Sequence, residues 1–344
     1  MSASSSTISS ENNGNLAEIT VENQISANQV KMKIRSIEDS ENSFLNMPDV
    51  VIDKVLGKLD FRQIQILRKT CHSLRNFIDD SRISGTLSTV KIRSSRNEIT
   101  VVYDSKYTVY YRTHEFGCQV DYKRKAKLLR KENSMEIFIE DLDAIIGNRK
   151  KPLEIFGFYE KDDGIFLPKL HKFLSSKLRP LSTVTLLMEV NWPSGVLQIL
   201  PFVCPGKLKN IRIFGNFFID IEKISNLEQW RSAEKMTLGR WMNSKNLEKF
   251  GHFREVFLTF DVVTLEVLMG LKEIFLASST LEQFQFTYIN IQNYQQFLPE
   301  NNRYFKIPNS EDVLKIVHNP VNKYIIFHRI GIFQAPENEK IEYF

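Results

Sequence analysis

The strongest concentration of one charge in the chain is a basic run, formed by Lys123, Arg124, Lys125, Lys127, Arg130 and Lys131. Closely spaced Lys and Arg side chains can bind phosphates, because electrostatic attraction supplies most of the affinity for nucleic acid that is independent of sequence. They can equally contact an acidic protein segment. Only Tyr122 accompanies the run, so aromatic side chains that would stack on bases are lacking. We therefore interpret the run as a solvated helix face or loop.

The other residues that could bind a metal or take part in catalysis are dispersed. None of the histidines has a metal-ligand spacing to Cys, Asp or Glu; they are His72, His114, His171, His252, His318 and His328. Asp162-Asp163-Gly164 begins like a calcium loop, but the ligands that should follow are missing, so a turn is expected. Phosphate-binding, dinucleotide-binding and nucleophile-elbow motifs are absent from the sequence. The sequence thus predicts no catalytic residue, no metal and no cofactor, and hence a protein that is not an enzyme.

Composition supports a globular protein with protein partners. The chain has 344 residues, of which 42% are hydrophobic and 25% charged, and its net charge is only +5. That charge is too small to indicate nucleic acid as a partner. No apolar run approaches the roughly 18 residues of a membrane span. Three widely separated cysteines, Cys71, Cys118 and Cys204, fit a reducing compartment, so we expect the protein in the cytoplasm or the nucleus.

The chain changes character after a polar N-terminal stretch. Residues 1–40 are rich in Ser, Asn and Glu, which predicts a disordered tail. Residues 41–85 predict a unit of three short amphipathic helices, in which Pro48 suits a first helical turn and Asp60 with Gln63 forms a capping box. Apolar residues recur at helical spacing in two stripes, Val51, Val55, Leu56 and Leu59, then Ile64, Leu67, Cys71, Leu74 and Ile78. So small a unit buries little apolar surface, and we expect its exposed apolar face to need a partner.

The larger part of the chain predicts alternating strands and helices. Residues 86–150 predict a β-rich connecting region, with Met135–Asp141 as a strand leading into a helix. Residues 151–330 contain a recurring pattern Leu-x-x-Φ-x-Φ, where Φ is apolar, and residues 331–344 are expected to be a C-terminal tail. The copies are Leu153/Phe156/Phe158, Leu181/Val184/Leu186, Leu208/Ile211/Ile213, Ala233/Met236/Leu238, Phe253/Val256/Leu258, Leu281/Phe284/Phe286 and Val321/Tyr324/Ile326. Most intervals are of roughly 20–29 residues, as in leucine-rich repeats. The predicted fold is therefore a degenerate β/α solenoid of leucine-rich-repeat type, or alternatively a generic α/β sandwich.

Two segments resemble domains of known families. The first resembles the F-box in Met47-Pro48-Asp49, Val55-Leu56, Leu59, Ile66-Leu67-Arg68 and the closing Cys71, Leu74 and Arg75. The second resembles the FTH domain of nematode F-box proteins in Leu197–Ile213 and Ile224–Leu238, notably Pro201, Pro205-Gly206, Leu208 and Gln229-Trp230. Leu74 stands where the F-box commonly has Trp. The expected class is α+β and α/β, with a three-helix F-box at 41–85 and a repeat-like FTH domain at 151–330.

The resemblance implies a function without catalysis. It implies the substrate-recognition subunit of a Skp–cullin–RING ubiquitin ligase, which binds the Skp adaptor, through it a cullin, and an unidentified target protein. The implied Skp-binding residues are Met47, Pro48, Val51, Val55, Leu56, Leu59, Leu67, Cys71 and Leu74. If the solenoid is formed, alternate strand residues face outward, and the target-binding candidates are Thr185, Arg212, Thr237, Phe257, Gln285 and Thr287. The alternative function is an F-box adaptor without proteolysis, acting with an RNA-binding protein in translational regulation.

Overall fold

The structure is a computed structural model, and it describes residues 47–80, 86–147, 149, 151–160, 164–215, 219, 221–242, 246–295, 297–298, 303–336 and 341–342. The predicted tail, residues 1–40, lies outside the described residues. By its contacts the chain divides into two compact units, Met1–Gly85 and Thr86–Phe344.

The described residues of the first unit, 47–80, form the helices α2 (Asp49–Leu56), α3 (Phe61–Leu67) and α4 (His72–Asp80). The capping box forms as predicted: the backbone N–H of Gln63 donates to Oδ1 of Asp60, and the N–H of Asp60 donates to Oε1 of Gln63, each at 2.8 Å. Pro48 is the N-cap of α2. These two helix starts fix where the chain turns between short helices, so that each helix can direct one face to a common core.

The second unit is one mixed sheet of fifteen strands, ordered β15-β12-β13-β14-β11-β10-β9-β8-β7-β6-β1-β2-β3-β4-β5. The strands are β1 (Thr89–Ser95), β2 (Glu98–Tyr103), β3 (Tyr107–His114), β4 (Gly117–Tyr122), β5 (Lys125–Arg130), β6 (Leu153–Glu160), β7 (Thr183–Glu189), β8 (Asn210–Phe214), β9 (Lys235–Met242), β10 (Glu255–Val263), β11 (Gln283–Ile291), β12 (Arg303–Lys306), β13 (Asp312–Asn319), β14 (Tyr324–Gly331) and β15 (Ile341–Glu342). The helices are α5 (Ser134–Ile146), α6 (Phe166–Ser175), α7 (Pro193–Ile199), α8 (Ile221–Ser225), α9 (Glu228–Ser232) and α10 (Leu265–Ala277), with short 3-10 turns η2 (Leu200–Phe202), η3 (Leu247–Phe250) and η4 (Ile332–Gln334).

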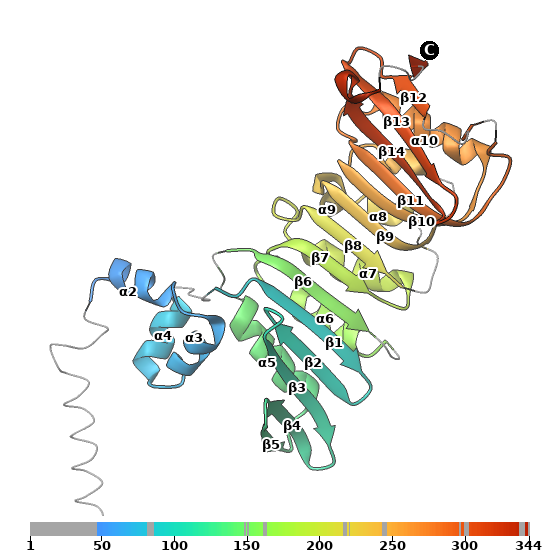
Figure 1. Cartoon of the computed structure of the whole chain (residues 1–344). Helices are drawn as coiled ribbons and strands as arrows, with labels where there is room; N and C mark the ends of the chain where they lie inside the picture. The colour runs from blue at the N-terminus through green and yellow to red at the C-terminus, as the bar shows by residue number, and fades with distance from the viewer. Residues whose placement is uncertain are drawn as a thin grey trace, which may run out of the picture. The chain divides into compact units, whose positions relative to one another are not determined.

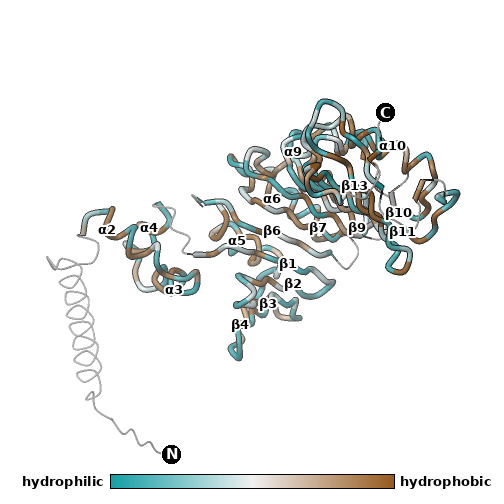
Figure 2. The backbone as a smooth tube through the Cα atoms, turned by 45° about the horizontal axis from the view of Figure 1, so that its top comes forward, coloured by the Kyte–Doolittle hydropathy of each residue, from teal (hydrophilic) through white to brown (hydrophobic). Residues whose placement is uncertain are grey.

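The helices lie along one face of this sheet and leave the other face uncovered (Figure 1). Accordingly, burial alternates along the strands, for example with Val256, Leu258 and Phe260 of β10 buried and the residues between them half-exposed. Along the strands the tube in Figure 2 changes between hydrophobic and hydrophilic residues in the same way. A strand with one apolar and one mixed face is the pattern expected of a sheet covered on one side.

The strands β1 and β6–β11 pair in parallel and form the centre of the sheet. Antiparallel strands flank this parallel centre on both sides. The fold prediction is therefore correct at the coarse level of a small helical unit followed by a large, mostly β domain. The sheet is mixed, however, and not the uniformly parallel sheet of a regular solenoid. Residues 86–150 and 151–330 contribute strands to the same sheet, and β15 of the expected C-terminal tail pairs with β12.

Register shows which of the expected copies are equivalent. Ile211 is paired with Met236, Met236 with Val256, and Val256 with Phe284, so these copies are aligned as predicted. The copy beginning at Leu181 was misplaced by two residues, because Leu186 is the partner of Phe156, and Thr183 occupies the position of Leu153. The last copy was wrong: β14 is antiparallel to β11, and Val321 is exposed.

Two further expectations are corrected by the structure. Residues 135–141 are helical and belong to α5, whose N-cap Asn133 accepts hydrogen bonds from the N–H groups of Met135 and Glu136. The basic run is neither a helix face nor only a loop, since Lys125–Arg130 is the edge strand β5. Both errors arise because local alternation of apolar residues does not distinguish a short helix from a strand.

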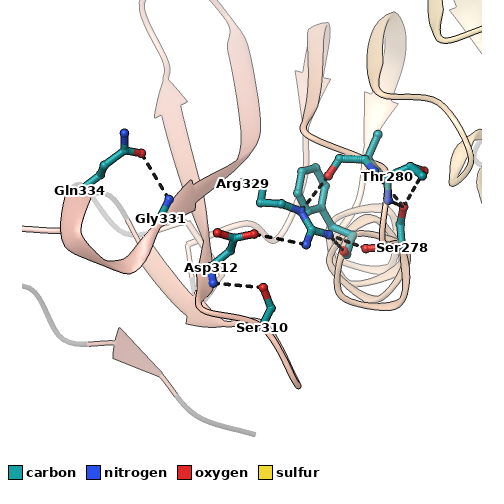
Figure 3. A network of polar contacts seen from close by, with 9 residues as sticks. Ser278, Thr280, Ser310, Asp312, Arg329, Gly331 and Gln334 are labelled. Atoms are coloured by element: carbon teal, nitrogen blue, oxygen red, sulfur yellow. Dashed lines mark hydrogen bonds and ion pairs between the residues drawn. The ribbon is translucent and has the colours of Figure 1, made fainter.

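An arginine joins the parallel centre to the C-terminal hairpin (Figure 3). Arg329 of β14 donates from Nε to the carbonyl of Leu281 at 3.1 Å, and from Nη2 to the carbonyls of Phe275 at 3.4 Å and of Ser278. Its Nη1 lies 3.7 Å from Oδ2 of Asp312 in β13. A cation at the C-terminal end of α10 satisfies carbonyls that have no partner within the helix and favours the helix dipole.

Candidate functional site

The helical unit has a small core of its own. Its buried residues are Ile52, Leu56, Ile64, Leu74 and Ile78, and Leu59, Leu67 and Phe77 pack against them partly buried. A bidentate ion pair supports this core, because Arg68 at the end of α3 donates from Nε and Nη2 to the two carboxylate oxygens of Asp79 in α4, at 2.8 and 2.9 Å. The unit thus fixes its three helices with very few residues.

An apolar surface remains outside that core. Five exposed residues form it, and we call them the helical apolar surface: Met47 (45% exposed), Val50 (66%), Val51 (42%), Val55 (43%) and Ile66 (51%). Val51 and Val55 are four residues apart on α2, so they share one side of the helix, and Ile52 and Leu56 share the inward side. A group of exposed aliphatic side chains is what a protein interface uses as anchors.

The structure divides the predicted Skp-binding residues into two groups. Met47, Pro48, Val51, Val55 and Cys71 are exposed, whereas Leu56 and Leu74 are core residues of the unit, and Leu59 and Leu67 lie against that core. Leu56 and Leu74 therefore belong to the core on which the exposed residues of α2 depend for their positions. Val50 and Ile66 were missed as candidates. Both could have been found from helical spacing, because residues two positions apart lie on opposite sides of a helix. Val50 is two residues from the inward Ile52 on α2, and Ile66 is two residues from the inward Ile64 on α3.

The uncovered face of the sheet carries the target-binding candidates. Backbone pairing places Leu187, Arg212, Thr237, Phe257 and Gln285 side by side in one row across five neighbouring strands. Neighbouring strands are about 4.8 Å apart, so the row is continuous. Thr185 lies two residues before Leu187, and Thr287 two residues after Gln285, with its Oγ1 3.1 Å from Oγ1 of Thr259. All six candidates therefore share this face, and their binding of a target remains a prediction.

A glycine leaves room for an aromatic ring next to this row. Phe214, at the end of β8, lies over Gly239 of β9, where an added Cβ would lie 2.2 Å from Cδ1 of the ring. The register between β9 and β10 shifts after Phe257, which marks an irregularity at this point. Gly in a strand commonly marks a bulge or a close approach, and here it lets Phe214 lie flat beside the row.

Charged residues of neighbouring strands are paired in this part of the sheet. Lys209 lies 2.6 Å from Glu234, Lys235 2.7 Å from Glu255, and Arg254 2.7 Å from Glu282. The hydrogen bond from Arg254 to Glu282 raises the pKa of that arginine. Such exposed pairs stabilise little, but they show that opposite charges are matched from one strand to the next.

A buried titratable cluster lies under α5 and was not expected from the sequence. Tyr111 donates to Oδ2 of Asp141 at 2.7 Å, and Tyr103 is also buried. Burial, together with the charge of Asp141, raises the pKa values of Tyr103 and Tyr111 above the ordinary value of tyrosine. Both phenols therefore stay neutral and act as hydrogen-bonding core residues.

Metal-ligating side chains, long apolar helices and cysteines are the features of the described residues that could indicate further chemistry. No group of three or more His, Cys, Asp or Glu side chains that could hold a metal ion occurs in the part of the chain the structure describes. In that same part no helix is long and apolar enough to cross a membrane. The three cysteines are free, with Cys71 exposed and Cys118 buried, and burial raises the pKa of the Cys118 thiol.

The fold and these surfaces define a class of protein: a small helical unit with exposed apolar residues, followed in the chain by a large sheet domain with one uncovered face. Comparison with known families matches an F-box domain at residues 44–84 and an FTH domain at residues 165–309. The chain is also similar to F-box A protein 224 of Caenorhabditis elegans, at 22% identity over 307 residues that cover 84% of this chain and 77% of that protein. The chain is therefore an F-box protein with a C-terminal FTH domain, as the resemblance implied. F-box domains generally bind the Skp adaptor, and proteins of this kind are typically adaptors rather than catalysts.

The residues that carried the FTH resemblance are structural. The side-chain amide of Gln229 donates to the carbonyls of Pro201 at 3.0 Å and of Val203 at 2.9 Å, which ties α9 to η2. Trp230 donates from Nε1 to the carbonyl of Lys249 at 3.2 Å, and its ring packs edge-on against Phe250 and Phe253. They hold successive connections together on the helical face.

Proposed function

We propose that this chain is the substrate-recognition subunit of a Skp–cullin–RING ubiquitin ligase. In this proposal the helical apolar surface binds the Skp adaptor, and the uncovered face of the sheet binds a target protein. The observation that carries it is the exposure of Met47, Val50, Val51, Val55 and Ile66 on a unit that has a separate core. Exclusion of water from such aliphatic side chains gives an interface much of its free energy.

The proposed mechanism needs no reacting side chain. A receptor that binds both the adaptor and a target raises the effective concentration of the target near a ubiquitin-charged enzyme. We infer that β1 and β6–β11 act as degenerate leucine-rich-type repeats, which would present the row from Leu187 to Gln285 as a continuous binding surface. The sparse, unpaired cysteines support a place of action in the cytoplasm or nucleus.

The test is adaptor binding by a surface variant that leaves the core intact. The double variant Val51→Asp/Val55→Asp places two charges on the helical apolar surface, so its affinity for a Skp adaptor should fall by about a hundredfold or more. Val321→Asp, at an exposed valine of the sheet domain, is the matched control and should bind as the native chain does. Native-like adaptor binding by the double variant would overturn the proposal.

A second arm of the experiment separates ligase function from the alternative. Co-purification with a cullin, together with ubiquitylation of a captured target that is lost on Arg212→Ala/Phe257→Ala, supports the receptor function. Binding of the Skp adaptor without a cullin would favour the adaptor that acts without proteolysis.

A further inference from the structure

The strand β5 ends the sheet and is unusually basic. It is the last strand in the order of the sheet, and five of its six residues are exposed. Among the described strands it pairs with β4 alone, to which it is joined by a tight turn whose residue Lys123 has a φ of 55°. With Lys123, Arg124 and Lys131, the strand and its ends carry six basic residues and no acidic one.

The register shows which backbone groups of β5 are available. The N–H of Lys131 donates to the carbonyl of Phe116 at 2.8 Å, and the pairing continues from Gly117 with Arg130 to Tyr122 with Lys125. In an antiparallel pair, residues alternate between those that bond the partner strand and those whose N–H and C=O point away from it. Since Lys131 bonds toward β4, the backbone groups of Ala126, Leu128 and Arg130 point to the free edge.

The charges of β5 also lack the partners that basic residues have elsewhere in this sheet. Lys209, Lys235 and Arg254, at or just before the starts of β8, β9 and β10, each form an ion pair with a glutamate at or just before the start of the neighbouring strand. Among the described residues, no ion pair is formed by any of the six basic residues, Lys123, Arg124, Lys125, Lys127, Arg130 and Lys131. The one acidic side chain of β4, Asp121, is paired with Arg112 and Gln119 instead. On its other edge β5 has no neighbouring strand among the described residues, so no acidic side chains lie there.

Lysines on an edge strand have a purely protective use, because they prevent edge-to-edge aggregation. Other devices that protect a free edge are a very short strand, a proline and a β-bulge. In β5 the edge runs for six residues paired without a bulge, and it presents Leu128 with 38% exposure between the cations. Apolar and basic side chains alternate from Lys125 to Leu128 along this free edge. Such an edge can bind an acidic strand, while its positive charge repels the same edge of a second copy of the chain.

We propose that the free edge of β5 binds an extended acidic segment of a partner protein, which adds to the sheet as a further strand. Main-chain hydrogen bonds to Ala126, Leu128 and Arg130 supply affinity, as in other strand additions. Glutamate or aspartate side chains of the segment pair with Lys125 and Lys127, which lie on one side of the strand, and give specificity. This site is separate from the helical apolar surface and from the row on the uncovered face, and it does not depend on the proposed ligase function.

Nucleic acid is the competing polyanion, and the observations favour the peptide. Single-stranded nucleic acid binds where aromatic side chains stack on successive bases, and within 123–131 there is no aromatic residue. An unpaired strand edge, in contrast, is specific for another polypeptide backbone.

The test measures binding of a synthetic strand to the full-length chain. A fluorescein-labelled nine-residue peptide that alternates Glu with Val and Thr is titrated with the protein, and anisotropy is followed. The comparison peptide has the same sequence with every second residue in the D configuration, so its charge is unchanged but it cannot form a regular strand. The all-L peptide should bind at least about tenfold more tightly, because only it can form the ladder of hydrogen bonds.

Protein variants separate charge from backbone. Lys125→Gln/Lys127→Gln should weaken binding by about three- to tenfold, whereas Lys169→Gln/Lys207→Gln, at exposed lysines elsewhere in the sheet domain, should not change it. Ala126→Pro removes one N–H from the free edge without touching the bonds to β4 and should weaken binding, with its fold checked by circular dichroism. Three results would each overturn the proposal. They are equal affinity for the all-L and the comparison peptide, displacement of the all-L peptide by a single-stranded oligonucleotide as effectively as by unlabelled all-L peptide, and no saturable binding of the all-L peptide.

Discussion

Phe214 lies over Gly239 so closely that a Cβ added to the glycine would lie 2.2 Å from Cδ1 of the phenylalanine ring. This contact joins β8 to β9 on the uncovered face, next to the row that contains Arg212 and Thr237. A glycine of this face therefore determines where one of its largest side chains lies.

Gly239→Ala should accordingly reduce the free energy of unfolding by about 1–3 kcal/mol, because the ring must move away from the new methyl group. Gly206→Ala is the control, since nothing lies within 4 Å of a Cβ at Gly206. Chemical denaturation followed by tryptophan fluorescence measures both. The double variant Gly239→Ala/Phe214→Ala should show a smaller loss than the two single losses added together, and strict additivity would contradict the contact.

Leu74→Ala should unfold the helical unit while the sheet domain stays folded. Leu74 is 8% exposed within a core of five buried residues, and loss of a buried leucine costs about 2–5 kcal/mol. Hydrogen–deuterium exchange over residues 49–80 measures the effect without contribution from the sheet domain. Ile66→Ala, at a residue that is 51% exposed, should leave exchange unchanged, and protection in Leu74→Ala equal to the native chain would show that this core is wrongly assigned.

The helical unit could be predicted from sequence because its signals are local. The capping box of Asp60 and Gln63 and the helical spacing of Ile64 and Ile78 each involve residues within a few turns. The sequence could not decide which side of α2 faces the core, since Val51/Val55 and Ile52/Leu56 are two equally apolar pairs that are shifted by one residue. Only packing against α3 and α4 decides between them.

The repeats show the same limit at longer range. Copies from Leu208 to Phe286 were aligned correctly because each strand pairs with the next in sequence. The pattern misplaced the second copy because a polar residue, Thr183, occupies the core position, with its hydroxyl donating to the carbonyls of Leu153 and Thr185. It also missed Leu87, Val90 and Ile92, although Val90 is paired with Phe156, because β2 to β5 and α5 separate β1 from β6 in sequence.

Arg329→Met should reduce the free energy of unfolding by about 2–4 kcal/mol, because two carbonyls at the end of α10 and the carbonyl of Leu281 before β11 lose a charged donor that is little exposed. Methionine keeps much of the side-chain volume, so packing changes least. Arg212→Met, at an exposed arginine of the same sheet, should cost less than about 0.5 kcal/mol. The two variants are compared by denaturation of the full chain, and equal stabilities would contradict the capping role of Arg329.

Gly270→Ala should have the opposite sign. Gly270 lies within α10, and nothing is found within 4 Å of the position of an added Cβ. Alanine reduces the conformational entropy of the unfolded chain and favours the helix, so the free energy of unfolding should rise by about 0.5–1 kcal/mol. A loss of stability would mean that an added methyl group at Gly270 meets a neighbouring atom.

His318 should make stability depend on pH. Oη of Tyr288 lies 2.7 Å from its Nε2, and the ring of Tyr294 packs edge-on against it. Burial lowers the pKa of His318 below its ordinary value of 6.5, so in acid the unfolded chain binds a proton that the folded chain resists. Because the unfolded state then holds more protons, the free energy of unfolding should rise as pH increases through about 6.5. His318→Gln removes this titration, so the difference in stability between the variant and the native chain should change with pH between about 5 and 7 and become constant above. A difference that stays constant over the whole range would show that His318 titrates alike in the folded and unfolded chain.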